Sequence, residues 1–176
     1  MKTLIVCYSF TGNNQALCGR LQRLLNCDSY RIMDIKRRTW LTILLDLLFN
    51  RMPKIQEGSP DISKYEKIIL LAPVWNAHVA TPMKSFIKRE KVNLRAYAFI
   101  SVCGGRPGQE AKLRQELTKL AGKAPAGLLE LEISKLPLGE NAQPKNNTLY
   151  RIQEPDLDRW DADITGFIRS MQEVPA

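Results

Sequence analysis

The stretch from Leu4 to Asn14 constrains the fold more than any other, because an apolar strand runs directly into a polar loop. Residues Leu4 to Tyr8 are apolar without polar alternation, which is typical of a strand that is covered on both faces in a parallel sheet. The next six residues read S-F-T-G-N-N and combine hydroxyls, a glycine and two amides. We therefore predict a strand, a tight loop and then a helix over Gln15 to Leu25.

The polar loop has the chemistry to hold one phosphate group. Ser9 and Thr11 offer hydroxyl donors, Gly12 allows a close approach of the backbone, and Asn13 and Asn14 can cap the helix. The N-terminus of a helix attracts anions through its free N–H groups and its dipole. The loop has no lysine and is too short for the Walker pattern, which disfavours a nucleoside triphosphate. An ordinary turn uses the same residue types, so a purely structural loop is the alternative.

A second loop with aromatic character follows the next buried strand, Tyr65 to Pro73. Residues 72–82 read A-P-V-W-N-A-H-V-A-T-P and precede a predicted helix over Met83 to Glu90. Trp75 in the middle of this loop can cover a flat ring, while Asn76 and backbone amides bond the edge of the ring. A core tryptophan in a connecting loop is the alternative interpretation.

The third buried strand, Tyr97 to Cys103, ends in a permissive loop over Gly104 to Gly108. Paired glycines at the end of a central strand bring backbone N–H groups close to a ligand. We interpret Cys103 as a packing thiol beside this loop. The remaining predicted elements are a strand over Asp28 to Ile35, a helix over Gln109 to Leu120, a fifth strand over Leu128 to Ile133, an irregular insertion over Ser134 to Arg151, and a final helix over Pro155 to Met171.

These motifs together resemble those of the flavodoxin family. The segment from Ser9 to Asn13 looks like the S/T-x-T-G-N loop with which flavodoxins hold the phosphate of FMN. A-P-V-W followed by P-x-K-x-F, here Pro82, Lys84 and Phe86, is similar to their flavin-stacking loop and the helix after it. The resemblance implies an α/β fold over residues 1–176 as a single domain, with a doubly wound five-stranded parallel sheet of strand order 2-1-3-4-5.

The resemblance also implies where FMN is held. The residues expected around the phosphate are Ser9, Phe10, Thr11, Gly12, Asn13 and Asn14. Those expected around the ring are Pro73, Val74, Trp75, Asn76, Ala77, His78, Cys103, Gly104 and Gly105. His78, the one histidine of the chain, is also a candidate for catalysis, because its unperturbed pKa lies close to neutrality. A surface imidazole without such a role is the alternative.

Three functions are compatible with such a pocket, and the sequence leaves open whether the protein is an enzyme. The first is an electron carrier between a reduced donor and an acceptor, which is a redox partner protein or a small molecule. The second is an FMN-dependent oxidoreductase that takes electrons from NAD(P)H and acts on a quinone or similar acceptor. The basic net charge of +8 and the lack of a second ring-covering aromatic in the Gly104 loop favour the second. The third is a binding module that has lost its flavin.

A very apolar segment over Thr39 to Arg51 has three interpretations. We expect a helix that is capped by Thr39 and ends before Pro53. It can be a crossover helix buried on the sheet, or a homodimer contact. It can also be an exposed Trp/Leu/Phe surface for a lipophilic substrate or for peripheral contact with an anionic membrane; its basic flanks are Lys36, Arg37, Arg38, Arg51 and Lys54.

Composition and charge limit the location and the partners. Residues 1–91 hold fifteen lysines and arginines against seven acids, whereas residues 92–176 hold eleven of each. The excess charge therefore lies in the first half, but no zinc-finger, RRM, KH or basic-helix pattern accompanies it, and we expect no nucleic-acid partner. The four cysteines lack metal-ligand spacing and predict no metal site. Reduced thiols, the absence of a signal-peptide layout and the absence of a transmembrane segment predict a cytoplasmic protein.

Overall fold

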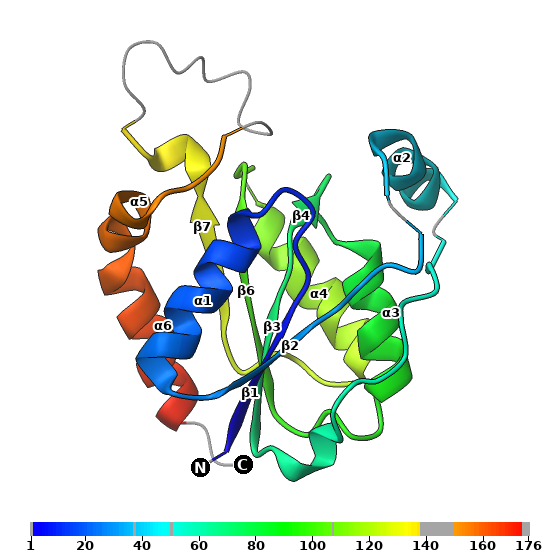
Figure 1. Cartoon of the computed structure of the whole chain (residues 1–176), viewed down its shortest axis with the longest axis horizontal. Coiled ribbons are helices and arrows are strands. Elements are labelled where there is room, and N and C mark those ends of the chain that lie inside the picture. Colours follow the sequence, from blue (N-terminus) through cyan, green and yellow to red (C-terminus); the bar gives the residue numbers. More distant parts are fainter. Residues whose placement is uncertain (1, 37, 50, 107, 138–149, 174–176) are drawn as a thin grey trace.

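The computed structural model describes residues 2–36, 38–49, 51–106, 108–137 and 150–173. Its main sheet has five parallel strands in the order β2-β1-β3-β6-β7 (Figure 1). These strands are β1 (Thr3–Cys7), β2 (Asp28–Arg31), β3 (Lys67–Leu71), β6 (Tyr97–Cys103) and β7 (Leu128–Glu132). Counted along the chain, the order is 2-1-3-4-5, which confirms the predicted fold class.

Helices cover both faces of this sheet. One face carries α1 (Asn13–Leu25), α5 (Glu154–Arg159) and α6 (Asp161–Glu173), and the other carries α3 (Thr81–Glu90) and α4 (Gln109–Ala121). Two short 3-10 turns, η1 (Ile62–Lys64) and η2 (Ile133–Lys135), and a small hairpin of β4 (Val74–Trp75) and β5 (His78–Val79) complete this part of the structure.

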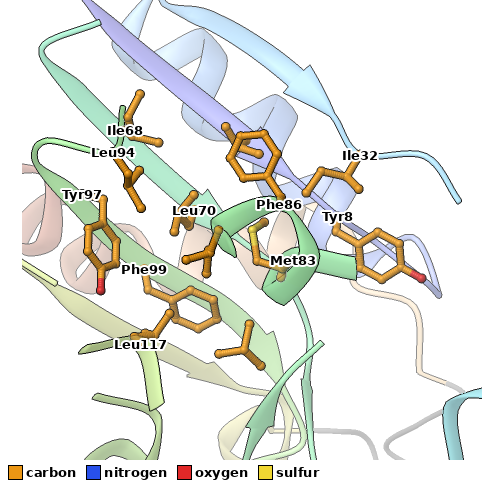
Figure 2. Packing of buried hydrophobic residues seen from close by; sticks show 14 of the residues in the cluster. Tyr8, Ile32, Ile68, Leu70, Met83, Phe86, Leu94, Tyr97, Phe99 and Leu117 are labelled. Carbon is orange, nitrogen blue, oxygen red and sulfur yellow. The ribbon is translucent and has the colours of Figure 1, made fainter. Parts of the chain in front are cut away.

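Alternate residues of β1, β3 and β6 enter two separate hydrophobic cores. In β1, Leu4 and Val6 pack under α3 and α4, whereas Ile5 and Cys7 pack under α1, α5 and α6. Figure 2 shows the first core, in which Met83 and Phe86 of α3 lie over side chains of β3 and β6. All five residues of β3 and all seven of β6 are buried, which explains why these strands have no polar alternation.

The parallel strands bring their carboxyl ends to one edge of the sheet. The loop after β1, the hairpin after β3 and the loop after β6 all lie at this edge, whereas the start of β1 and the end of α6 lie near the opposite edge (Figure 1). Strand β1 pairs with β2 on one side and with β3 on the other. The strand order reverses there, and such a switch point is where doubly wound sheets bind ligands.

Two of the predicted elements differ clearly from those of the structure. Strand β2 ends at Arg31 rather than Ile35, because the chain then leaves the sheet; Asp34 pairs with Ile55 in an isolated antiparallel bridge. The predicted final helix is two helices, since the buried Trp160 ends α5 while its carbonyl begins the hydrogen bonding of α6. Of the predicted irregular insertion, residues 138–149 lie outside the described residues.

Helix α2 (Trp40–Leu48) lies away from both faces of the sheet (Figure 1). A capping box of Thr39 and Thr42 starts it, as the sequence indicated for Thr39. Of its nine residues only Ile43 and Asp46 are buried, and the described members of the two hydrophobic cores include no residue of α2. The interpretation as a crossover helix buried on the sheet is therefore wrong.

Candidate functional site

The loop after β1 presents an uncapped helix N-terminus at the switch point. Gly12 takes a left-handed conformation with φ of 101°, and helix α1 begins at the next residue without a side-chain cap. The backbone N–H of Gly12 donates to Oγ of Ser9 over 3.1 Å, which closes the loop. The predicted capping by Asn13 and Asn14 is wrong, because both residues already belong to the helix.

The two asparagine side chains instead anchor α1 to distant parts of the chain. The amide of Asn13 donates to the carbonyl of Tyr150 over 2.9 Å and accepts from the N–H of Ile152 over 3.2 Å. The amide of Asn14 forms the same two-way pair with the backbone of Val102. Since both amides are engaged by backbone groups, the remaining groups of the loop that can meet a ligand are backbone N–H groups and hydroxyls.

A cavity of about 560 Å³ opens beside this loop. Three of its lining residues were predicted from the sequence. Its lining also holds three arginines and one aspartate, so that positive groups outnumber negative ones; two of the arginines are near one another in the chain and the third comes from a distant segment. The lining residues are Tyr8, Ser9, Phe10, Thr11, Arg31, Ile32, Met33, Asp34, Arg38, Trp40 and Arg151. Hydroxyls, a helix N-terminus and arginines together form a site that suits a phosphate group.

The β4–β5 hairpin fixes Trp75 beside the first loop. Asn76 and Ala77 have φ of 52° and 63°, which is the conformation of a two-residue type I′ turn. The guanidinium of Arg106 donates to Oδ1 of Asn76 over 2.8 Å and so joins this hairpin to the loop after β6. The ring of Trp75 meets Tyr8 and Phe10 edge-on, with ring centroids 6.1 and 6.2 Å apart.

A second cavity of about 340 Å³ lies between this hairpin, the loop after β6 and helix α2. Its lining is mainly apolar and aromatic, with backbone from the two glycines. The lining residues are Trp40, Ile43, Leu44, Leu47, Val74, Trp75, Asn76, Gly104, Gly105, Arg106 and Gln109. Trp40 lines both cavities and packs on Phe10 with ring centroids 4.9 Å apart. This arrangement suits a flat ring next to a phosphate.

The structure brings together about half of the predicted site residues as cavity lining. Ser9, Phe10 and Thr11 line the first cavity, and Val74, Trp75, Asn76, Gly104 and Gly105 line the second. The others, which border these residues without lining either cavity, are Gly12, Asn13, Asn14, Pro73, Ala77, His78 and Cys103. None of the predicted site residues lies in α2, although an exposed apolar surface for a lipophilic substrate was one of the three interpretations of residues 39–51.

His78 is directed to helix α4. Its Nδ1 lies 2.9 Å from Oε1 of Glu116, and the same oxygen accepts from Nζ of Lys84 over 2.6 Å. The other oxygen of Glu116 accepts from the backbone N–H of Val79 over 2.8 Å. In this arrangement Glu116 holds the hairpin on α3 and α4, and the imidazole is half-exposed beside it.

A chain of polar contacts ties α2 to the core. The hydroxyl of Tyr8 donates to Asp34 over 2.9 Å, and Arg38 bonds Asp34 over 2.8 Å and Asp46 over 2.6 Å. Asp46 also accepts from the hydroxyl of Thr81 over 3.4 Å. Burial and then the charge of Asp34 raise the pKa of Tyr8, so that its phenol stays protonated and donates. These contacts hold the inner side of α2 against the domain.

Comparisons with known proteins agree with this fold. A family model for the flavodoxin domain matches residues 48–132, a range that holds the second and third loops. A search of curated proteins found no match. The FMN complex of a flavoprotein from Lactobacillus acidophilus NCFM has a TM-score of 0.64 at 21% identity, over 73% of this chain and 92% of that one.

Two further solved structures extend the likeness. A protein from Bacteroides eggerthii DSM 20697 has a TM-score of 0.64 at 14% identity, over 92% of this chain and 96% of that one. The two-electron reduced flavodoxin of Megasphaera elsdenii has a TM-score of 0.50 at 15% identity, over 74% and 86% of the two chains. Identities this low establish the fold alone. Together with the strand order, they show that this chain has the flavodoxin-like fold, and the family model marks its residues 48–132 as similar to a flavodoxin domain.

Proposed function

We propose that the protein binds FMN and transfers electrons between a reduced donor and an acceptor, as a flavodoxin-type redox protein. The observation that carries the proposal is the pair of cavities at the switch point, one lined by hydroxyls and arginines and the other by aromatic and apolar groups, which share Trp40. A phosphate joined to a planar ring system has these two parts. The Lactobacillus relative forms a complex with FMN, which supports this choice of ligand.

Different residues would contact the phosphate and the ring of FMN. Ser9 and Thr11 would donate to the phosphate together with the N–H groups at the start of α1, where the helix dipole favours negative charge. Trp75 and Trp40 would border the ring. Gly104 and Gly105 would let backbone groups approach the ring edge. Bound flavin would supply the redox chemistry, since it takes up and releases electrons.

The protein around the ring would exclude water and orient the acceptor. Ile43, Leu44 and Leu47 of α2 give the second cavity an apolar wall. This wall favours a second candidate function, an FMN-dependent oxidoreductase that takes electrons from NAD(P)H and passes them to a small apolar acceptor such as a quinone. Binding of an apolar acceptor against this wall would remove apolar surface from water, which is favourable. Protonation by His78 stays a prediction, and it requires the imidazole to leave Glu116.

The location and partners complete the proposal. The four cysteines are free thiols, which fits a reducing cytoplasm. In the described part of the chain, none of the helices has the length and hydropathy needed to cross a membrane. A carrier would dock a redox partner protein at the edge where the two cavities open, whereas an oxidoreductase would need only its small acceptor.

An absorbance titration with FMN is the experiment that tests the proposal. We expect perturbed flavin bands and quenched flavin fluorescence with a 1:1 end point, and weaker binding by Trp75→Ala. Tyr65→Ala is the matched control, since Tyr65 hydrogen-bonds Asp28 away from the site. A protein that leaves the spectrum of FMN unchanged would refute the cofactor assignment and favour a flavin-free binding module.

Anaerobic addition of NADH or NADPH to the complex then separates the two functions. Bleaching of the flavin bands within the mixing time would identify an oxidoreductase that takes hydride directly. Bands that persist until dithionite is added would identify a carrier that needs a partner protein. His78→Gln would slow turnover of a quinone in the first case without weakening FMN binding, if the imidazole protonates the acceptor.

A further inference from the structure

Helix α2 presents an apolar ridge to solvent. The ridge consists of Trp40, Leu41, Leu44, Leu48 and Phe49, whose exposed fractions are 52, 64, 52, 69 and 63%. At roughly 100° per residue, the four ridge positions within the helix fall on an arc of about 100°. The buried Ile43 and Asp46 lie on the opposite side. The orientation of the helix is therefore the opposite of the usual one: its one acidic side chain faces the protein, and its large apolar side chains face solvent.

The exposed charges that flank α2 in the described part of the chain, from residue 35 to residue 56, are all positive, and the next exposed acid along the chain is Glu57. Between residues 35 and 56 the exposed ionisable side chains among the described residues are Lys36, Arg51 and Lys54. Asp46 is buried and bonded to Arg38. The guanidinium of Arg51 lies over the ring of Phe49, 5.1 Å from its centroid. A surface that combines bulky apolar groups with unopposed cations is complementary to an apolar phase with an anionic boundary.

This charge pattern distinguishes between the possible binding partners of the ridge, a second copy of the chain and a lipid bilayer. A second copy of the chain would bring the same cations against one another, and like charges at a contact cost free energy. An anionic bilayer attracts each cation and accepts the apolar side chains at the level of the headgroups. A helix of nine residues, about 13 Å long, fits within the interface and cannot cross the hydrocarbon core.

We propose that the α2 ridge docks the protein peripherally on an anionic lipid surface. Leu41, Leu48 and Phe49 would enter the headgroup region, with Arg51 and Lys54 on the lipid phosphates. Leu44 belongs both to the ridge and to the wall of the second cavity, so docking would place the mouth of that cavity at the lipid. The docking needs no bound flavin, and its test is independent of the proposed function.

Vesicle flotation is the direct test. The full chain, without added FMN, is mixed with vesicles of phosphatidylcholine alone or with 30 mol% phosphatidylglycerol as the probe. We expect roughly tenfold tighter association with the anionic vesicles, and release at 0.5 M NaCl through screening of the cations. Absence of association with the anionic vesicles would overturn the proposal, and so would equal, salt-insensitive association with both.

Paired variants assign the effect to the ridge. Leu41→Ser with Leu48→Ser should abolish flotation, and these residues line neither cavity. The matched control is Leu24→Ser with Val92→Ser, which removes two exposed apolar groups elsewhere. Arg51→Gln with Lys54→Gln should weaken association about tenfold, against Lys112→Gln with Lys119→Gln as control. Flotation of the ridge variant at the native level would overturn the assignment. So would a concentration-dependent dimer that only the ridge variant disrupts.

Discussion

Asn14 on α1 and Val102 on β6 are joined by two hydrogen bonds across 88 residues of sequence. Oδ1 of Asn14 accepts from the N–H of Val102 over 2.9 Å, and its Nδ2 donates to the Val102 carbonyl over 3.1 Å. Both residues are buried. The side chain thus continues the hydrogen bonding of β6 at its carboxyl end and fixes the start of α1 relative to the loop that follows β6.

Asn14→Ala should therefore destabilise the fold strongly. The substitution leaves a buried N–H and a buried carbonyl of Val102 without partners, at a cost of about 3 kcal/mol in the free energy of unfolding. Asn93→Ala, at an exposed position, should cost less than about 0.5 kcal/mol. Urea unfolding followed by circular dichroism measures both values. Equal stability of the two variants would mean that the Asn14 bonds contribute little.

Thr11→Glu should prevent FMN binding. The change removes a hydroxyl donor that lines the first cavity and places a negative charge where the phosphate is expected, so the FMN dissociation constant should rise at least about a hundredfold. Gln115→Glu adds the same charge on the exposed side of α4 and should leave the affinity within about twofold. Fluorescence titration compares the two. An unchanged affinity for Thr11→Glu would contradict the phosphate assignment.

The sequence predicted those parts of the site whose chemistry is local along the chain. The loop at Ser9 to Gly12 and the loop around Trp75 are recognisable because each follows directly on a buried strand, whereas the hairpin within the second loop was not predicted. The partners of Asn13 and Asn14 could not be predicted, since they lie 88 residues or more away. Asparagine at the start of a helix is expected to cap it. In the structure the two side-chain amides instead hydrogen-bond backbone groups that are distant in the sequence.

Helix α2 shows the other limit of sequence reasoning. The local sequence pattern predicts the helix and its start at Thr39. Because apolar residues lie on several faces of this helix, the sequence does not show which face packs against the rest of the protein. The arginine at position 38 decides this, because its bonds to Asp34 and Asp46 place the acid inward. A single acid in an apolar helix near an arginine was the available signal.

Gly105→Ala should destabilise the loop after β6, whereas Gly104→Ala should not. Gly105 has φ of 81°, and a methyl group there would meet the Glu132 side chain. That side chain can turn away, but the left-handed backbone costs an alanine about 1–2 kcal/mol. A Cβ at Gly104 meets nothing within 4 Å. Thermal melts of the two variants give the difference, and equal melting temperatures would show that the loop relaxes freely.

Arg38→Met should release α2 from the domain. The substitution keeps an unbranched apolar stem but leaves the carboxylates of Asp34 and Asp46 without their cation, at a cost of about 3 kcal/mol. Hydrogen exchange of amides 41–48 should accelerate by more than a hundredfold, while exchange in β3 and β6 changes less. Lys64→Gln breaks an exposed ion pair with Asp61 and should alter neither. Unchanged exchange in α2 would show that its apolar contacts alone hold it.

Cys103 should resist alkylation in the folded protein. Burial, and next the charge of Glu130, raise the pKa of this thiol to about 12, from an ordinary 9.0. Each pH unit changes the thiolate fraction tenfold, so at pH 8 the folded thiol should react with iodoacetamide about a thousandfold more slowly than a free one. Cys27, half-buried with its pKa raised by burial to about 11, should be modified first. Mass spectrometry of a time course separates the two sites.

The same shift predicts a loss of stability in alkali. The folded state favours the neutral thiol of Cys103, so its contribution is fully present below about pH 9. Above that pH the unfolded thiol ionises while the folded one remains protonated up to about pH 12, and the free energy of unfolding therefore falls as the pH rises between these values. Cys103→Ala should reduce the slope of stability against pH in this range. An identical slope would mean that the folded thiol ionises as readily as the unfolded one.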